Sequence, residues 1–145
     1  MPRLFTIGYE KLLPPELVAE LQHAGVERLI DVRFRPQSRR PGMSKTRLGE
    51  FLGDHGIAYE HRRALGTPPD IRWFFRNGRE AEGREAFREH VEFSAAEHLD
   101  ALAAELDRGP ATVLMCLEAD PAGCHRGVLA EQLRTRTPDL EVVDR

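Results

Sequence analysis

The feature that most constrains the fold is an uninterrupted apolar run, Ala-Thr-Val-Leu-Met-Cys-Leu, at residues 111–117. The run directly follows Gly109 and Pro110, which end a helical pattern, and it is far too short to span a membrane. A strand with one face in water alternates apolar and polar residues, whereas a strand covered on both faces is apolar throughout. The run therefore predicts a central strand of a sheet that helices cover on both sides.

Strand and helix patterns alternate along the rest of the chain. Apolar residues at helical spacing predict helices, and the first of them is expected to end at Gly25 in a left-handed conformation. Residues 67–79 contain Trp73-Phe74-Phe75 and predict an ordered excursion whose aromatic cluster needs a surface to cover. β-Branched and aromatic runs predict further strands at residues 4–8, 27–33, 57–61 and 140–143.

Two serines are candidate helix caps. Ser44 precedes an amphipathic stretch and is expected to cap it. Ser94 stands three residues before Glu97, which is the spacing of a capping box, and an apolar helical face follows. We therefore expect one helix to start near Ser44 and another near Ser94.

This alternation predicts an α/β fold with three layers. We expect a mostly parallel central sheet of about five strands with helices on both faces, because parallel strands need crossover connections that lie on the faces of the sheet. The chain shows no repeat and no linker, so residues 1–145 are predicted to form a single domain. Ligands of such sheets bind beyond the carboxyl ends of the strands.

The distribution of charge singles out one loop at the carboxyl-end edge of the predicted sheet. The net charge is −3, from 21 basic and 24 acidic residues, but residues 33–47 contain six basic residues and no acidic one. The remainder has 15 basic and 24 acidic residues, a balance of −9. The basic loop, as we call residues 33–47, directly follows a predicted strand. Its basic residues are Arg33, Arg35, Arg39, Arg40, Lys45 and Arg47.

The basic loop predicts an anion-binding site. Guanidinium groups pair bidentately with phosphate or carboxylate, and the helix start near Ser44 adds free N–H groups. The alternative is a solvated loop, some of whose arginines pair with the acidic residues of 80–108. The candidate anion-binding residues, taken over the whole predicted edge, are Tyr9, Arg33, Arg35, Ser38, Arg39 and Arg126.

Cys124, His125 and Arg126 form a second candidate element, at the start of a predicted helix. The helix dipole and the neighbouring arginine favour a thiolate, so Cys124 is a candidate nucleophile and His125 a group that orients it or transfers a proton. Glu118 and Asp31 are candidate general bases near the same edge. The alternatives are an inert thiol at Cys124, and an Asp31 that simply pairs with Arg33 or Arg126.

The cysteines allow two further interpretations. Cys116, Cys124 and His125, with His61 or Glu118, are potential zinc ligands, but seven residues separate the cysteines and Cys116 falls inside a predicted strand. The two cysteines are also a potential redox pair, although the Cys-x-x-Cys spacing is absent. From the sequence we therefore expect no metal and no cofactor.

Seven short segments of the chain form a pattern when they are taken together. They are Thr6-Ile-Gly-Tyr9, Leu29-Ile-Asp-Val-Arg33, the Ser38-Arg-Arg loop, Gly56-Ile-Ala-Tyr59, Leu65-Gly66, Cys116-Leu-Glu118 and Cys124-His-Arg126. In these segments the chain resembles the family of domains of unknown function 488. The resemblance covers nearly the whole chain and implies a compact cytosolic α/β domain, mostly from prokaryotes, with no settled reaction. The chain departs from the family pattern at Met43, where a phenylalanine is typical, and at Val143-Asp144, where His-Ile is frequent.

The leading functional hypothesis is an enzyme or ligand-binding domain whose arginine-lined pocket takes a phosphorylated small molecule, a nucleotide or a nucleic-acid end, with Cys124 as a reactive group. The alternative is a non-catalytic nucleic-acid-binding module that uses the basic loop, with Trp73, Phe74 or Tyr59 as stacking faces. A third hypothesis is an interaction domain. The chain shows no signal-peptide pattern and no apolar run of about 20 residues, so we expect a cytoplasmic protein without membrane contact. The sequence does not predict an oligomeric state.

Overall fold

Five strands form one sheet in which every neighbouring pair is parallel, in the order β3-β2-β4-β1-β5. The computed structural model describes residues 2–118 and 124–145. The apolar run forms the strand β4, which is buried along its whole length between β2 and β1. This confirms the predicted central strand and the predicted α/β class. The strands are β1 (Arg3–Gly8), β2 (Arg28–Asp31), β3 (Ala58–His61), β4 (Thr112–Cys116) and β5 (Glu141–Asp144).

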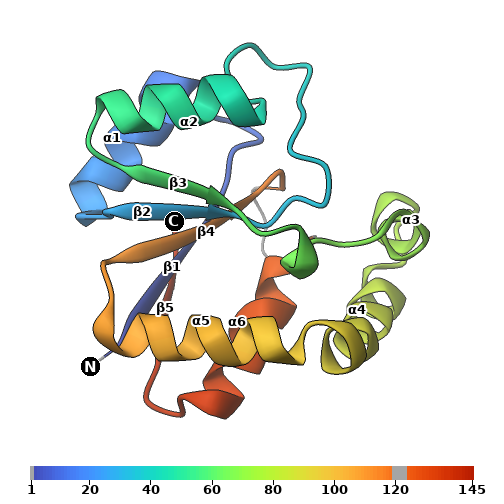
Figure 1. Ribbon diagram of the computed structural model, residues 1–145. Helices are drawn as coiled ribbons and strands as arrows, with labels where there is room; N and C mark the ends of the chain where they lie inside the picture. Colours follow the sequence, from blue (N-terminus) through green and yellow to red (C-terminus); the bar gives the residue numbers. More distant parts are fainter. Residues whose placement is uncertain (1, 119–123) are drawn as a thin grey trace.

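Helices cover both faces of the sheet, which gives the three predicted layers (Figure 1). The helices α1 and α2 lie on one face, α5 and α6 lie on the other, and α3 and α4 lie beyond the carboxyl ends of the strands. Within the described ranges, no helix is both long and apolar enough to cross a membrane. The helices are α1 (Pro14–Ala24), α2 (Lys45–Asp54), the short 3₁₀ helix η1 (Arg63–Leu65), α3 (Pro69–Arg76), α4 (Glu80–Ser94), α5 (Ala96–Arg108) and α6 (Arg126–Arg136).

The side chains of β4 alternate between two apolar cores. Val113 and Met115 pack with the α1 and α2 layer, whereas Leu114 and Cys116 pack with the layer that contains α5 and α6. All four are at most 1% exposed. Burial of a leucine-sized side chain contributes roughly 1.5–3 kcal/mol, so both layers hold β4 in place. The position of its carboxyl end, where Cys116 lies, is thereby fixed.

The helix ends agree with the sequence predictions in part. Gly25 follows α1 with φ of 75°, which confirms the predicted left-handed end. Ser44 holds the N-cap position of α2, but its hydroxyl bonds to the backbone of Ser38 in the basic loop instead of to the helix. The predicted capping box at Ser94 is wrong. Ser94 is the last residue of α4, and the buried Ala95 stands before α5 because the two helices follow each other without a loop.

The excursion predicted at residues 67–79 contains the helix α3, which packs against α4. Phe75 packs against the core, whereas Trp73 is 50% exposed and the guanidinium of Arg79 lies 5.6 Å from the centre of its ring. The aromatic cluster is thus only partly used for packing. The sequence pattern does not predict the helix α4, because its buried face contains only two large apolar residues, Phe87 and Val91, besides Gly83.

Candidate functional site

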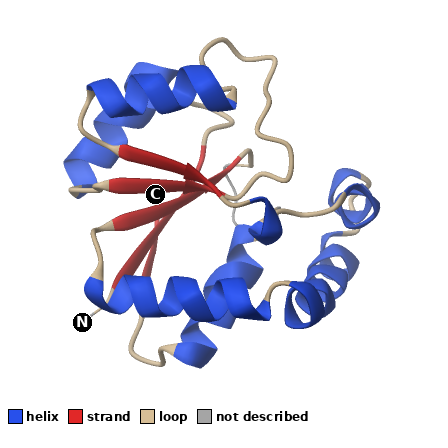
Figure 2. Cartoon of the chain, viewed as in Figure 1, coloured by secondary structure: helices blue, strands red, loops and turns tan. Residues whose placement is uncertain are grey.

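A pocket lies at the carboxyl ends of β1, β2 and β4, where Figure 2 shows the strand arrows converging on a group of loops. Its volume is about 470 Å³, open solvent at the mouth included. The helices that follow β1 and β2 lie on one face of the sheet, and the helix that follows β4 lies on the other. Connections that leave neighbouring strands on opposite faces leave a crevice at the strand ends, which explains the place of this pocket.

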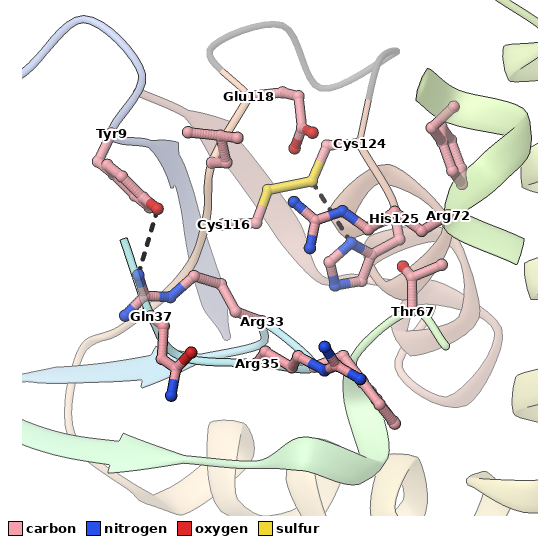
Figure 3. A pocket seen from close by; sticks show the side chains of 13 residues that line it. Tyr9, Arg33, Arg35, Gln37, Thr67, Arg72, Cys116, Glu118, Cys124 and His125 are labelled. Carbon is pink, nitrogen blue, oxygen red and sulfur yellow. Dashed lines mark hydrogen bonds between the residues drawn. A yellow bond between two sulfur atoms is a disulfide. The ribbon is translucent and has the colours of Figure 1, made fainter. Parts of the chain in front are cut away.

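The pocket brings together most of the side chains that the sequence singled out (Figure 3). Three further predicted residues, Ser38, Arg39 and Arg126, do not line it, and Asp31 lies behind Arg33. Unforeseen lining residues come from the segment 67–75 and from the basic loop. The predicted residues that line the pocket are Tyr9, Arg33, Arg35, Glu118, Cys124 and His125, and the others are Phe34, Gln37, Thr67, Arg72, Phe75, Cys116 and Leu117.

Arg33 is held inside the protein by Asp31. Its Nε and Nη2 atoms donate to the two carboxylate oxygens of Asp31 at 2.9 and 2.7 Å, and both side chains are at most 5% exposed. The Nη1 atom donates to the Tyr9 hydroxyl at 3.2 Å and to the carbonyl oxygen of Met43 at 2.8 Å. Burial alone would lower the pKa of Arg33, but the hydrogen bonds and charge of Asp31 outweigh it and the pKa is raised. The sequence-level alternative that Asp31 pairs with Arg33 is thus confirmed.

Asp31 also anchors β3. Its second carboxylate oxygen accepts a hydrogen bond of 2.5 Å from the Tyr59 hydroxyl, and its first accepts one of 3.1 Å from the backbone N–H of Arg33. Burial and the negative charge of Asp31 both raise the pKa of Tyr59. Asp31 is therefore surrounded by donors, and its role in this geometry is to position Arg33 at the pocket wall.

Arg35 and Arg72 contribute cationic side chains to the pocket and, unlike Arg33, form no ion pair among the described residues. Arg35 is exposed and Arg72 is half-buried, and both line the pocket from opposite segments, the basic loop and α3. Among the residues that the structure describes, neither has a carboxylate within ion-pair distance. Nothing in the sequence distinguishes Arg72 from the other arginines, because 19 of the 21 basic residues are arginine.

Thr67 adds a buried polar group to the same pocket. Thr67 is 5% exposed, and its Oγ1 atom has no hydrogen-bond partner among the described residues. Buried hydroxyl groups nearly always have a partner, in the protein, in water or in a ligand. Thr67 thus offers a hydrogen-bonding position to whatever fills the pocket.

Cys116 and Cys124 lie at the floor of the pocket and are joined by a disulfide. The Nδ1 atom of His125 is 3.6 Å from the Cys124 sulfur, and its Nε2 atom is 2.7 Å from the carbonyl oxygen of Val32. Burial lowers the pKa of His125 to about 4, so the imidazole is neutral at pH 7. The sulfur atoms and the ring thus form one buried group beneath the cationic mouth.

Arg126 stands behind this group. Its side chain is fully buried, and its Nη1 atom donates to the Cys116 sulfur at 3.1 Å and to the carbonyl oxygen of Glu118. The Glu118 side chain lines the pocket. Arg126 therefore supports the end of β4 and the cysteine pair, and its contacts are inside the protein.

Ser38, Arg39 and Arg40 belong to the outer part of the basic loop. The Ser38 hydroxyl accepts a hydrogen bond of 3.1 Å from the N–H of Arg40, and Arg40 in turn donates to the carbonyl oxygens of Tyr9 and Glu10. Arg39 is exposed. These contacts attach the loop to the end of β1 and shape the mouth of the pocket.

Gly66 permits a close approach that shapes the pocket wall. A Cβ atom on Gly66 would lie 2.5 Å from the backbone nitrogen and 2.6 Å from the Cα atom of Phe34, which lines the pocket. We expect Gly66→Ala to lower the free energy of unfolding by about 1–3 kcal/mol, because the two backbone segments must separate. Urea denaturation measures the change. Gly53→Ala is the control, because nothing lies within 4 Å of its added methyl group. Equal losses in both variants would contradict the prediction.

Comparison with known proteins agrees with the resemblance seen in the sequence. Residues 14–133 match the model of the family DUF488, a domain of unknown function. Neither the curated proteins nor the solved structures contain a match to the chain. Because the match spans most of its length, the chain belongs to the DUF488 family.

Proposed function

We propose that this DUF488 protein binds the phosphoryl group of a small molecule, a nucleotide or a nucleic-acid end in the strand-end pocket. One observation carries the proposal: the side chains of Arg35, Arg72 and Thr67 line the same pocket, and among the described residues none of these side chains has a hydrogen-bonding or ion-pair partner. Guanidinium groups and a hydroxyl are suited to phosphate oxygens, which accept several hydrogen bonds at once.

In this proposal the two kinds of arginine have different roles. Arg35 and Arg72 bind the anion directly, because neither forms an ion pair with a carboxylate among the described residues. Arg33 positions the wall, because Asp31 and Tyr9 already accept its hydrogen bonds. A phosphate is favoured over a carboxylate because it brings more acceptor oxygens to the two arginines and to the Thr67 hydroxyl. Glu118, which also lines the pocket, repels both kinds of anion.

Cys124 gives the pocket a reactive group. In the disulfide form its sulfur is not a nucleophile, whereas after reduction the thiol lies beside the neutral Nδ1 atom of His125, the nearest base. Asp31 is not suited to the role of general base, because four donors already surround its carboxylate. If the protein is an enzyme, Cys124 and His125 are the groups that act on the bound ligand, with Glu118 as a further proton acceptor.

The proposal predicts a loss of phosphate binding when Arg35 or Arg72 is removed. Titration calorimetry with inorganic phosphate, AMP and a 5′-phosphorylated oligonucleotide should show binding to the disulfide form of the protein. We expect Arg35→Ala and Arg72→Ala each to weaken binding by about ten- to a hundredfold, since a hydrogen bond to a charged group contributes about 1.5–3 kcal/mol.

Arg47→Ala is the matched control, because Arg47 is an exposed arginine of the basic loop that does not line the pocket. Equal weakening in all three variants would indicate attraction to the general positive charge and would contradict a specific phosphate site. Absence of any binding to the unaltered protein would remove the proposal.

A non-catalytic nucleic-acid-binding module is the second candidate, and it is favoured by a different observation. Arg35, Arg39, Lys45 and Arg47 are exposed along the basic loop. A second hollow beside the pocket is lined by Arg72, Trp73 and Arg76, which offers cations next to an aromatic ring. In this case the oligonucleotide should bind more tightly than AMP, and its affinity should fall steeply with salt because each neutralised phosphate releases counterions.

A further inference from the structure

Three potential metal-binding atoms meet beneath the pocket. The sulfur atoms of Cys116 and Cys124 and a ring nitrogen of His125 all lie within 4.8 Å of one another, and all three residues are buried. Cys116 comes from the end of β4, whereas the other two precede α6. The fold therefore joins donors that a gap in the sequence separates, as Figure 3 shows.

The orientation of His125 is the one that metal-binding histidines adopt. Its Nε2 atom is hydrogen-bonded to the carbonyl oxygen of Val32 at 2.7 Å. Because a carbonyl oxygen only accepts, Nε2 carries the proton and the lone pair of Nδ1 points toward the cysteine sulfurs. Such an outer hydrogen bond to a backbone carbonyl fixes the tautomer and direction of most histidines that bind metal.

The separation between the Cys124 sulfur and the His125 ring already fits a tetrahedral ion. With Zn–S bonds of about 2.3 Å and Zn–N bonds of about 2.05 Å, a sulfur and a nitrogen ligand lie about 3.6 Å apart, and two sulfurs lie about 3.8 Å apart. The observed distance from the Cys124 sulfur to Nδ1 of His125 is 3.6 Å. The two sulfurs are bonded to each other in the disulfide, so they have to move apart after reduction, and the 7.3 Å between the cysteine Cα atoms leaves room for two separate thiolates.

Arg126 supplies the outer support on the other side. Its Nη1 atom is 3.1 Å from the Cys116 sulfur, so it is placed to donate to a thiolate there. A charge-assisted hydrogen bond of this kind stabilises the deprotonated sulfur, which is the form that binds metal. The positive charge of Arg126 also partly offsets the negative charge of the two thiolates before the ion binds.

We propose that, in the reduced protein, Cys116, Cys124 and His125 bind a divalent ion of the zinc type, with the fourth coordination position open to the pocket. Three protein ligands and one open position are the arrangement of catalytic zinc sites. The disulfide is the alternative oxidised state, and it excludes the ion because it uses the same two sulfurs. This inference stands on the cysteine and histidine geometry and is independent of the proposed phosphate binding.

The experiment begins with reduction of the disulfide by a water-soluble phosphine. The phosphine gives two electrons to the disulfide and takes an oxygen atom from water, which leaves two thiols and a phosphine oxide. The reduced, full-length protein is then titrated without oxygen with Zn²⁺ and, as a spectroscopic probe, Co²⁺. We expect one ion per chain, with Co²⁺ absorption bands typical of a tetrahedral site containing thiolate ligands. The disulfide form should bind none.

Variants test each ligand. Cys116→Ser, Cys124→Ser and His125→Gln should each weaken Zn²⁺ binding by more than the roughly 10–100-fold that the loss of an outer-shell partner costs. His23→Ala, an exposed residue at the end of α1, is the control and should leave it unchanged. Circular dichroism establishes which variants are folded. If a variant does not fold, Zn²⁺ titration of the reduced, unaltered protein still tests the metal site.

Two outcomes would overturn the metal site. One is a reduced protein that binds no Zn²⁺ while both thiols remain open to alkylation, and the other is binding that His125→Gln leaves unchanged. The phosphate measurement uses the disulfide form, so the two proposals fail separately. Arg35→Ala should weaken phosphate binding to the disulfide form but leave Zn²⁺ binding to the reduced form unchanged, which distinguishes the pocket mouth from the site at its floor.

Discussion

Asp31→Ala should lower the free energy of unfolding by about 3–5 kcal/mol, the usual cost of breaking a buried ion pair by removing one partner. The substitution leaves the guanidinium of Arg33 almost fully buried without its counter-charge. It also removes the acceptor for the Tyr59 hydroxyl and for the backbone N–H of Arg33. Urea denaturation at pH 7, followed by circular dichroism, measures the loss.

The control is Asp100→Ala, whose ion pair with Arg136 is largely exposed and is worth at most about 1 kcal/mol. If Asp31→Ala does not fold, Tyr59→Phe still tests the cluster, since it removes a single hydrogen bond to a charged group at a cost of about 1.5–3 kcal/mol. The double variant Asp31→Leu with Arg33→Met should recover much of the stability, because no charge then stays buried alone. Equal stabilities of the Asp31 and Asp100 variants would contradict this account.

The second large effect is a dependence of stability on pH that His125 causes. The pKa of His125 is lowered to about 4 in the folded, metal-free disulfide form, mainly by burial, and is about 6.5 in an unfolded chain. Between these values the unfolded chain binds the extra proton and the folded protein does not. Stability is therefore complete above pH of about 6.5 and falls as the pH is lowered toward 4, by about 3 kcal/mol in all.

Urea denaturation at a series of pH values measures this decline. Carboxylates contribute as well, so the comparison is with His125→Gln, which cannot take up the proton but keeps a donor for the Val32 carbonyl oxygen. The difference between the two proteins should shrink as the pH falls through this range. His23→Ala, in which an exposed histidine is removed, should follow the unaltered protein. A parallel decline in His125→Gln would show that His125 is not the cause.

The architecture was accessible from the sequence because its signals are local. The apolar run at 111–117 requires cover on two faces, and the alternation of strand and helix patterns requires parallel connections. Gly25 could be placed for a similar reason, since a left-handed helix end favours glycine. The capping box at Ser94 failed because a one-residue connection buries Ala95 between two helices, and no local rule anticipates that packing.

The position of the site at the sheet edge could be predicted from the sequence, but the partners of its side chains could not. Parallel pairing of the strands places the backbones of Tyr9, Arg33 and Cys116 at one edge of the sheet, independently of where their side chains point. The sequence did not show that Arg33 and Arg126 point inward to partners, whereas Arg35 lines the pocket and forms no ion pair among the described residues. Nothing in the sequence indicated that Arg72 and Thr67 line the pocket, because their positions depend on how α3 packs beyond the ends of the strands.

The sequence by itself determined the class of fold, the edge of the sheet at which the candidate functional residues lie, and the family. Only the tertiary structure decided what the cysteines can do. Their spacing along the chain argued against a metal site, yet β4 and the start of α6 place two sulfurs and the nitrogen of His125 within 4.8 Å. The reason is physical: spacing rules describe ligands on one local turn, whereas here packing of α6 against the sheet sets the distances between donors.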